Sequence, residues 1–512
     1  MNTNKISRVL AMFFVGAMAF TSCTDGFESA NRPGEFTSGD ELSRDNYNTG
    51  AFLLQMQNAA FPEQENDYQM MQDLIGNYLG RYFTYANNGF AGSNFAKMNA
   101  PLGWVSWPFA QITPRIVSAF KEVERLTDKT SLGYSWALIL RTQAFLRLTD
   151  MYGPFTIGAE EDPNAYSSQE KVYTNLIADL DLAINNLKGM VTGGKLVAYE
   201  ESDRVYNGDF TKWLKFANSL KLRMAIRMRY VNPTMAQTVA EQAVADGVIM
   251  DNKDNCSIFY KPHGLYKTSV EWGDTRACAD IETYMNGYND PRIDKYFKPT
   301  ATEGDRPIIG CRAAADIKAK PTAMAIYSAA NVNDDTRGVW LTAAEMAFCR
   351  AEGALLGWSG MGGNVEQLYN QGIALSFEQW GVSGAEDYAN NSDRTPASYK
   401  DADGGYGGDA SAPSSITIKW DNDASMDVKM ERLMVQKWIA MFPDGQEAWN
   451  EIRRTGYPKV MPLAQSAAFD LLVPNRIPFD NSEKVNNPEN YAKAVQLLGG
   501  ADNYATKMWW QK

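Results

Sequence analysis

The sequence predicts a mainly α-helical protein, a tetratricopeptide-like helical-repeat scaffold with long loops and little β-structure. Apolar residues recur three and four positions apart, as on one face of a helix, over residues 136–153, 167–187, 210–230 and 342–358. Small residues, mainly alanines, lie on some of these faces and would let two helices pack closely, although no strict 34-residue period is visible. Strand signals are sparse, and the best of them is SITIKW at residues 415–420.

Two of these segments begin with residues that favour a helix N-terminus. In SSQEKVYTNLIADLDLAINNL, Ser167 and Glu170 have the spacing of a capping box, in which both side chains accept hydrogen bonds from backbone N–H groups of the first turn. Thr342 and Glu345 repeat the pattern in TAAEMAFCRAEGALLGW. We therefore expect a helix to begin at each place.

The segment FTKWLKFANSLKLRMAIRMRY, residues 210–230, combines an apolar face with a basic one. The apolar face carries Trp213, Phe216, Leu220, Met224 and Met228. Lysines and arginines surround it, and a run of charges on a helix is usually a solvated face. We interpret the basic face as solvent-exposed, and binding of an acidic partner is the alternative.

The N-terminus has the pattern of a secretory signal peptide. Lys5 and Arg8 precede an apolar run that ends at Phe20, which is shorter than the roughly 20 residues of a membrane-spanning helix. Cys23 then stands at the cleavage site, as in a bacterial lipoprotein signal, although Phe20 stands where leucine is usual. We predict a signal peptide over residues 1–22 and lipid attachment at Cys23, and an ordinary cleaved signal is the alternative.

The residues that follow predict a tether and then a single domain. Residues 23–45 are rich in Gly, Ser, Asp, Asn and Glu, a composition typical of a flexible linker. Residues 46–512 are long for one domain, yet helical-repeat proteins of this length often fold as one unit. Thr24 stands where an inner-membrane retention signal has aspartate, so the outer membrane is the favoured location.

Composition and charge argue against nucleic acid as a partner. The 512 residues include 45% hydrophobic residues, enough for a large core. Lys and Arg number 49 against 61 Asp and Glu, for a net charge of −12. Nucleic-acid binding needs basic patches that neutralise phosphates, so this acidic chain does not favour it.

Cysteine and histidine are too few and too scattered to predict a metal site. Beyond Cys23 the cysteines are Cys256, Cys278, Cys311 and Cys349, with no C-x-x-C spacing. We interpret them as buried thiols, and a bridge between Cys256 and Cys278 is the alternative. The one histidine, His263, rules out an H-E-x-x-H zinc site and is interpreted as a solvated loop residue.

Two further motifs fail on the residues that their chemistry needs. GMVTGGKL, residues 189–196, resembles a phosphate-binding loop, but Leu196 stands where Ser or Thr must hold magnesium. DNDASMDVKMER, residues 421–432, has Met426 and Arg432 where a calcium loop needs glycine and glutamate. A noncanonical ion site there stays open as an alternative, and we predict no metal and no cofactor.

Six long segments form an ordered set of motifs. They are LRTQAFLRLTDMYGPF from Leu140, DRVYNGDFTKWLKFANSLKLRMAIRMRY from Asp203, NDPRIDKYFKP from Asn289, EMAFCRAEGALLGW from Glu345, VQKWIAMFPDGQEAWNEIRRTGYP from Val435 and VPNRIPFDNSEKVNNPENY from Val473. This set resembles the SusD/RagB family of nutrient-binding outer-membrane lipoproteins. The resemblance spans nearly the whole chain after Cys23 and is strongest to the SusD-like branch.

The resemblance implies a function without catalysis. Members capture oligosaccharides, and some of them peptides, on a loop-rich face of a tetratricopeptide-like scaffold. The chain is therefore expected to act as the lid of a SusC-like TonB-dependent transporter, lipid-anchored in the outer membrane and facing the exterior. Three alternatives stay open: a peptide-binding RagB-like lid, a surface glycoside hydrolase with two carboxylates about 5–9.5 Å apart, and a structural protein that binds only its transporter.

The ligand contacts are predicted from chemistry, because the family motifs are scaffold motifs. Aromatic rings bury the apolar face of a sugar and amides bind its hydroxyls. The loop-like stretch 77–109 interleaves both kinds, and the resemblance implies ligand contacts there. The candidate residues are Tyr82, Tyr85, Asn87, Asn88, Asn94 and Trp104, with Trp272 and Tyr406 as further loop candidates. Trp107 is expected to pack in the core, because a periodic helical segment follows it.

Overall fold

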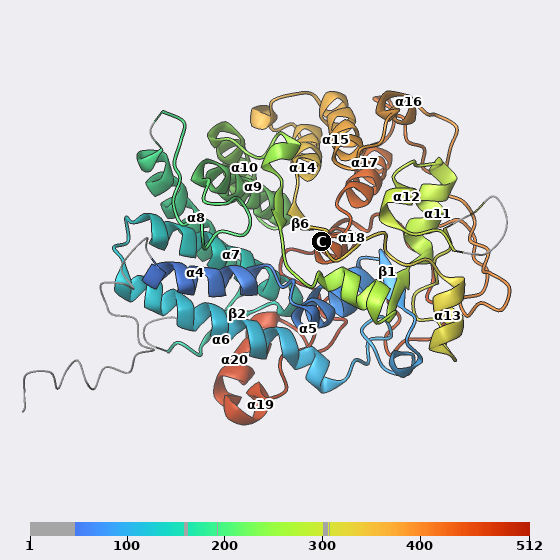
Figure 1. The fold of residues 1–512 in the computed structure, drawn as a ribbon, viewed down its shortest axis with the longest axis horizontal. Coiled ribbons are helices and arrows are strands. Elements are labelled where there is room, and N and C mark those ends of the chain that lie inside the picture. The colour runs from blue at the N-terminus through green and yellow to red at the C-terminus, as the bar shows by residue number, and fades with distance from the viewer. Residues whose placement is uncertain (1–46, 158–161, 192, 301–305, 307) are drawn as a thin grey trace, which may run out of the picture. The chain divides into compact units, whose positions relative to one another are not determined.

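Helices make up most of the chain, as predicted (Figure 1). The computed structural model describes residues 47–157, 162–191, 193–300, 306 and 308–512. The predicted signal peptide, Cys23 and tether therefore lie outside the described residues. Contacts divide the chain after Asn48, and Thr49–Lys512 form one compact unit.

The helices and strands have the following bounds. The longer α-helices are α4 (Tyr47–Ala60), α6 (Leu102–Leu126), α7 (Leu132–Tyr152), α8 (Gln169–Met190), α9 (Phe210–Met228), α10 (Pro233–Asp246), α11 (Ala279–Tyr288), α14 (Ala343–Leu355), α15 (Val365–Gln379), α17 (Met426–Ala440), α18 (Gly445–Thr455) and α20 (Pro488–Leu498). Short α-helices are α5 (Glu65–Asp67), α12 (Ile293–Tyr296), α13 (Lys320–Ile326), α16 (Ala385–Ala389) and α19 (Glu483–Asn486). Segments of 3₁₀- or π-helix are η2 (Tyr68–Asn77), η3 (Asn88–Phe90), η4 (Asn252–Asp254), η5 (Tyr266–Glu271) and η6 (Ser359–Met361). Three two-stranded antiparallel pairs join β1 (Phe83–Tyr85) to β5 (Thr275–Ala277), β2 (Phe155–Thr156) to β3 (Tyr166–Ser167), and β4 (Cys256–Ile258) to β6 (Gly338–Leu341).

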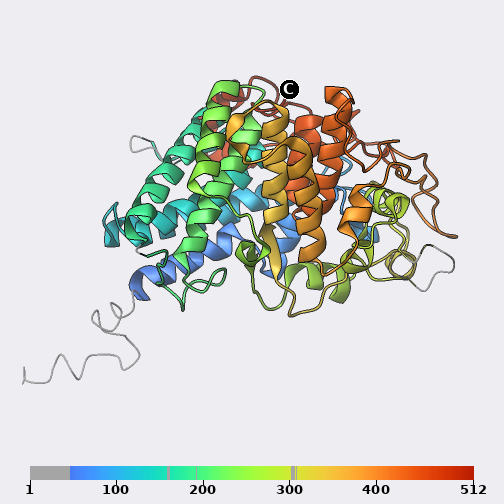
Figure 2. The same cartoon turned by 90° about the horizontal axis from the view of Figure 1, so that it is seen from above.

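Consecutive helices pack against one another, which is the arrangement of a helical-repeat scaffold. Helices α6 to α10 form successive contacts, and α14 packs on α15 and α17 (Figure 2). Aromatic rings fill the contacts between these helices. The ring centres of Trp136 in α7 and Trp213 in α9 lie 5.5 Å apart, and those of Phe348 in α14 and Tyr369 in α15 lie 6.0 Å apart. The predicted helical segments are therefore helices whose apolar faces meet.

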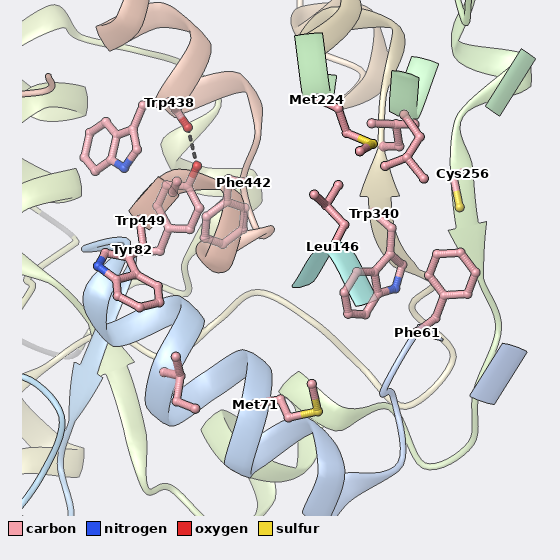
Figure 3. Close-up of a cluster of buried hydrophobic side chains, with 14 of the residues drawn as sticks. Phe61, Met71, Tyr82, Leu146, Met224, Cys256, Trp340, Trp438, Phe442 and Trp449 are labelled. Atoms are coloured by element: carbon pink, nitrogen blue, oxygen red, sulfur yellow. Dashed lines mark hydrogen bonds between the residues drawn. The ribbon is translucent and has the colours of Figure 1, made fainter. Parts of the chain in front are cut away.

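One continuous apolar core runs through the unit (Figure 3). Near the start of β6, Phe61 packs edge-on against Trp340 at 5.6 Å. Tyr82 stacks on Trp438 at 5.5 Å and its hydroxyl donates to the Trp438 carbonyl. Trp107 is half-buried against this core, in agreement with its expected packing role.

The helix starts are close to those predicted. Thr342 caps α14, and its Oγ1 accepts from the Glu345 N–H at 3.1 Å. The cap of α8 is Ser168, one residue after the predicted Ser167, and it accepts from the Lys171 N–H. Glu345 does not complete a capping box, because its carboxylate binds Arg223 instead, at 2.6 and 2.7 Å.

The basic side of α9 is buried, so our prediction of a solvated face is wrong. Lys221, Arg223 and Arg227 are at most 4% exposed. Arg227 donates to Asp150 of α7 and Glu447 of α18, and Arg223 pairs with Glu345 of α14. Carboxylates on neighbouring helices thus replace water around this face.

Burial and neighbouring charges shift the pKa values of these buried arginines and carboxylates in opposite directions. Burial alone would lower the pKa of Arg227, but Glu447 and Asp150 raise it well above its usual value. Burial would likewise raise the pKa of Glu447, whereas Arg227 and Arg223 lower it to about 2. Both groups are therefore charged in the folded protein, and each depends on its partners for that charge.

His263 is also buried, which corrects the prediction of a solvated loop residue. Its side chain is 3% exposed, and Nδ1 accepts from the Tyr266 N–H at 3.2 Å, so the neutral ring carries its proton on Nε2. Nε2 lies 4.0 Å from Glu63 Oε2. Burial lowers the pKa of His263 to about 4 and raises that of Glu63 to about 8, so both are neutral near pH 7.

The predicted strand at 415–420 is extended but has no partner strand, so that prediction is wrong. Its burial alternates, with Ile416, Ile418 and Trp420 inside. Side chains rather than a second strand satisfy its carbonyls, since Tyr288 and Tyr369 hydroxyls donate to Ile416 and Ile418. The alternating pattern therefore reported one buried face, not a sheet.

All four described cysteines are buried free thiols, as predicted, and Cys256 and Cys278 are not bridged. The polar stretch 381–413 carries only the short helix α16 and one isolated bridge, between Tyr399 and Ala410. It is a long loop, as expected.

We expect Arg227→Met to destabilise the protein strongly. Removing the guanidinium leaves Asp150 and Glu447 buried without their main counter-ion, which costs about 3–5 kcal/mol in free energy of unfolding. Arg125→Met is the control, because Arg125 is exposed and, within the described part of the chain, pairs only with Glu122 across one helical turn. Urea unfolding followed by circular dichroism measures both, and equal midpoints for the two variants would contradict the assignment.

A second prediction concerns the pH dependence of stability. The folded chain holds the Glu63 proton up to a pH of about 8 and the unfolded chain releases it near 4.5, so the wild type loses stability as the pH rises between these values. Glu63→Gln cannot ionise and keeps an acceptor for the Trp340 indole, which donates to Glu63 at 3.0 Å. The stability of the variant relative to wild type should therefore rise by about 1–3 kcal/mol from pH 5 to pH 8 in urea unfolding. Glu65→Gln removes a carboxylate at a partly exposed position and is the control; an equal rise there would refute the prediction.

Candidate functional site

A short strand pair brings two of the predicted ligand contacts together across 185 positions of sequence. β1 pairs with β5 so that Tyr85 lies opposite Thr275. The Ala86 N–H donates to the Asp274 carbonyl at 2.6 Å, which extends the pairing by one step. Asn87, directly after β1, therefore lies beside the turn that carries Trp272.

Asp274 is the hub of this region. Its side chain is buried, and Oδ1 accepts from Asn87 Nδ2 at 2.8 Å and from Lys320 Nζ at 2.5 Å. Oδ2 accepts from Gln69 Nε2 at 3.1 Å. One carboxylate thus joins the loop after β1, the start of α13 and η2, and holds them at fixed separation.

The turn between Trp272 and Asp274 requires a glycine. Gly273 has φ +71, a conformation that favours residues without a Cβ. A Cβ at this position would lie 2.4 Å from Met324 Cε on α13. The close contact places the half-buried Trp272 at the surface next to α13, with Lys267 Nζ 5.7 Å from its ring centre.

The loop from Asn87 to Pro101 is ordered by its own amides. Asn87 Oδ1 caps η3 by accepting from the Gly89 N–H, and Asn94 accepts from the Lys97 N–H while donating to the Phe90 carbonyl. Asn88 is exposed and its side chain is left facing outward from this frame.

An aromatic cluster fastens the same loop to the first turn of α6. Trp104 packs edge-on against Phe90, with ring centres 5.0 Å apart, and nearly parallel to Phe95, with ring centres 6.3 Å apart. Trp104 and Phe90 are half-buried, whereas Phe95 is fully buried. The cluster therefore offers part of two rings to a ligand and anchors the third in the core.

Tyr406 lies in a separate loop at the other end of α13. Asp401 closes this loop by accepting from the Gly407 and Gly408 N–H groups, and the Tyr406 N–H donates to the hydroxyl of Tyr327. Tyr327 directly follows α13, whose first residue is Lys320. Both loops therefore contact α13, the Trp272 turn at Lys320 and Met324 and the Tyr406 loop at Tyr327, just beyond the end of the helix.

Three predicted contacts are buried and bound within the protein. Tyr82 and Tyr85 are fully buried, with their hydroxyls donating to the carbonyls of Trp438 and Ala315. Asn94 is fully buried as well. These side chains present no surface to a ligand, so we remove them from the predicted contact set; their polar atoms hold the frame beneath it.

Sequence reasoning missed the residues that position this site. Asp274 and Lys320 are 46 positions apart in the sequence, and nothing in their spacing indicates that they form a pair. Phe90 lies inside the stretch that was singled out, where the interleaving of aromatics and amides was the available signal. The hub could not be found because its partners come from three segments that are far from it in the sequence.

The fold and the sequence are shared with known proteins. The sequence model of the family described as SusD-like, the SusD and RagB outer membrane lipoproteins, matches residues 29–511. The chain belongs to the SusD/RagB family. This confirms the resemblance carried by the six motifs and the SusD-like, mainly helical fold. Among curated proteins no match was found.

Solved SusD homologues superpose over nearly the whole unit. One from Bacteroides thetaiotaomicron is 34% identical with a TM-score of 0.86, and covers 91% of this chain and 99% of its own. One from Bacteroides uniformis is 34% identical with a TM-score of 0.85, over 91% of this chain and 100% of its own. A chitin-binding SusD homologue from Flavobacterium johnsoniae is 34% identical with a TM-score of 0.84, over 91% of this chain and 98% of its own.

Membrane and metal features were also sought in the described residues. No helix among them combines the length and apolar character needed to span a bilayer. Within the same residues, no group of three or more His, Cys, Asp or Glu side chains is arranged to hold a metal ion.

We expect Asp274→Ala to loosen this SusD-like site. The change leaves the Lys320 ammonium and the amides of Asn87 and Gln69 without their acceptor, at a cost of about 1–3 kcal/mol in free energy of unfolding. Hydrogen exchange of residues 86–90 and 272–277 should increase as well. Asp403→Ala, at an exposed loop carboxylate, is the control; unchanged exchange in Asp274→Ala would contradict the role of a hub.

Proposed function

We propose that this SusD-family protein binds oligosaccharides at the cell surface, as a nutrient-capturing lid of a SusC-like TonB-dependent outer-membrane transporter, and performs no chemistry on them. The observation that carries the proposal is that the β1–β5 pair and the Asn87–Asp274 hydrogen bond join the loop of Asn88, on which Trp104 packs, to the turn of Trp272. A homologue of 34% identity that binds chitin supports a glycan as the ligand.

The proposed site has the chemistry that a sugar needs. Half-buried Trp104 and Trp272 offer ring faces to the apolar side of a pyranose, and the exposed Asn88 offers an amide to its hydroxyls. Asn87 acts through Asp274 and η3, because both ends of its amide are already hydrogen-bonded. Tyr406, in the loop that binds Tyr327 beyond the end of α13, would contact a further sugar unit.

The N-terminal segments fit a lid. Residues 1–22 would direct secretion, lipid on Cys23 would hold the chain at the outer membrane, and residues 23–45 would tether the nutrient-binding domain that follows. A short flexible tether gives a lid a high effective concentration at its transporter. Closure of a lid then shields the bound ligand from bulk water.

Calorimetric titration of the chain from Thr24 tests the proposal. The panel contains chitin oligosaccharides, host and plant oligosaccharides, and peptides, and each mixture is analysed afterwards for cleavage. We expect a glycan to bind without cleavage. Trp272→Ala should weaken this binding at least tenfold, or about 1.4 kcal/mol, because a central aromatic anchor is lost.

Trp509→Ala is the matched control, because Trp509 is a half-buried tryptophan that packs on Tyr173 away from β1 and β5. Its affinity should equal that of the wild type. Cleavage would instead identify a glycoside hydrolase, and binding of peptides alone would identify a RagB-like lid. Equal loss of affinity in both tryptophan variants would remove the site from the β1–β5 region.

A further inference from the structure

A cavity lies between the loop that precedes α9, the last residue of β4 and the first residue of β6. It shares no lining residue with the Trp272 face. Its volume is about 480 Å³. The register of β4 and β6 places Ile258 opposite Gly338, so Phe259 and Arg337 meet just beyond the last pair. The cavity is also lined by Arg204, Tyr260 and Lys261.

The cavity is cationic in an acidic protein. Arg204, Lys261 and Arg337 line it, and Asp203 is the only carboxylate among its lining residues, whereas the whole chain has a net charge of −12. Among the described residues, no carboxylate lies within 4.0 Å of the Arg204 or Arg337 guanidinium, and Lys261 pairs with Asp335 at 3.0 Å and Asp334 at 3.4 Å.

Asp203 cannot serve as the counter-ion of the cavity, because its oxygens are already occupied. Oδ1 accepts from Val205 N–H at 2.9 Å and Tyr206 N–H at 3.1 Å. Oδ2 accepts from Gly208 N–H at 2.9 Å and from the Trp213 indole at 2.8 Å. With its side chain 4% exposed, this carboxylate shapes the loop, and its hydrogen bonds go to backbone N–H groups and an indole rather than to the cations of the walls.

Arg337 is held in place by neutral acceptors. Nε donates to Ser257 Oγ at 2.9 Å, and Nη2 donates to the carbonyls of Ser257 at 2.5 Å and of Arg204 and Val205 at 3.3 Å. These bonds tie the two walls together. They leave Nη1 without a hydrogen-bond partner in the described part of the chain, on a planar group suited to bind a carboxylate or sulfate.

Aromatic rings lie beside these cations. Phe259 is 41% exposed and presents ring surface at the rim of the cavity. The Arg204 guanidinium lies 5.5 Å from the ring centre of Tyr260, which fixes it over that ring. A ring face next to the Arg204 and Arg337 guanidinium groups suits a ligand with an apolar face and a negative group.

We propose that this cavity is a binding site for an acidic saccharide, whose carboxylate or sulfate pairs with Arg204, Lys261 and Arg337 while its ring packs on Phe259. The inference goes beyond the proposed function, because the cavity shares no lining residue with the Trp272 face. It stands or falls independently of that face.

Titration of the chain from Thr24 with three tetrasaccharides tests the inference. Oligogalacturonate carries carboxylates, a κ-carrageenan oligosaccharide carries sulfates, and galactotetraose is the neutral probe. We expect at least one acidic probe to bind at least tenfold more tightly than the neutral one, with an affinity that falls as salt rises from 50 to 300 mM. The probe that binds distinguishes carboxylate from sulfate.

Variants locate the binding. Arg204→Gln with Lys261→Gln, and separately Phe259→Ala, should each weaken the acidic probe at least tenfold; all three side chains are exposed or partly exposed, so folding is retained. Lys419→Gln with Lys493→Gln removes the same charge at exposed positions elsewhere and should change nothing. Trp272→Ala should also leave the acidic probe unaffected, whatever it does to neutral glycans.

Two results would overturn the inference. One is the absence of binding by either acidic probe at millimolar concentration. The other is binding that the control pair weakens as much as the cavity pair, which would mean attraction by charge without a site.

Discussion

The buried ion network between α9 and α18 is the interaction on which the rest of the structure depends. Arg223 and Arg227 of α9 bind carboxylates from α7, α14 and α18, and Arg454 of α18 binds Glu352 of α14 at 2.7 Å. Seven charged groups, three arginines and four carboxylates, would each be costly to bury alone, and they satisfy one another across four helices. The helical layers are therefore joined by charge pairs with defined geometry as well as by apolar packing, which allows little sliding.

The candidate site rests on this frame through α18 and η2. These elements cross so closely that a Cβ on Gly76 of η2 would lie 2.8 Å from the Gln446 backbone nitrogen of α18. η2 carries Asp73, whose carboxylate accepts from Thr275 Oγ1 of β5 at 2.5 Å. β5 pairs with β1, and the turn before β5 holds Trp272. A short chain of contacts thus runs from the ion network to the surface, so the proposed sugar platform is preformed.

Periodicity in the sequence predicted which segments are helical and which of their faces are apolar. It did not predict the surroundings of side chains whose partners come from distant parts of the chain. The apolar faces of α8, α9 and α14 were readable because burial on a helix repeats every three to four residues. The basic side of α9 was misread because a row of arginines looks the same whether water or buried carboxylates surround it. The burial of His263 and the missing partner strand of residues 415–420 were also mispredicted, because the segments that pack on them are not visible in the local sequence. At the candidate site, Trp104, Trp272 and Asn88 stay predictions from residue type, whereas the burial of Tyr82 and Tyr85 and the hub at Asp274 depend on distant segments.

One stretch of chain, from Phe259 to Asp274, contributes to both surfaces. Its first residues line the cationic cavity and its last residues form the Trp272 turn. Between them, buried His263 packs against Tyr68 with ring centres 6.4 Å apart, and the His263 N–H donates to Asp334 at 3.2 Å. The middle of the stretch is therefore anchored in the core, which fixes each end. A ligand at either surface meets residues that are already in place and loses little binding free energy to ordering them.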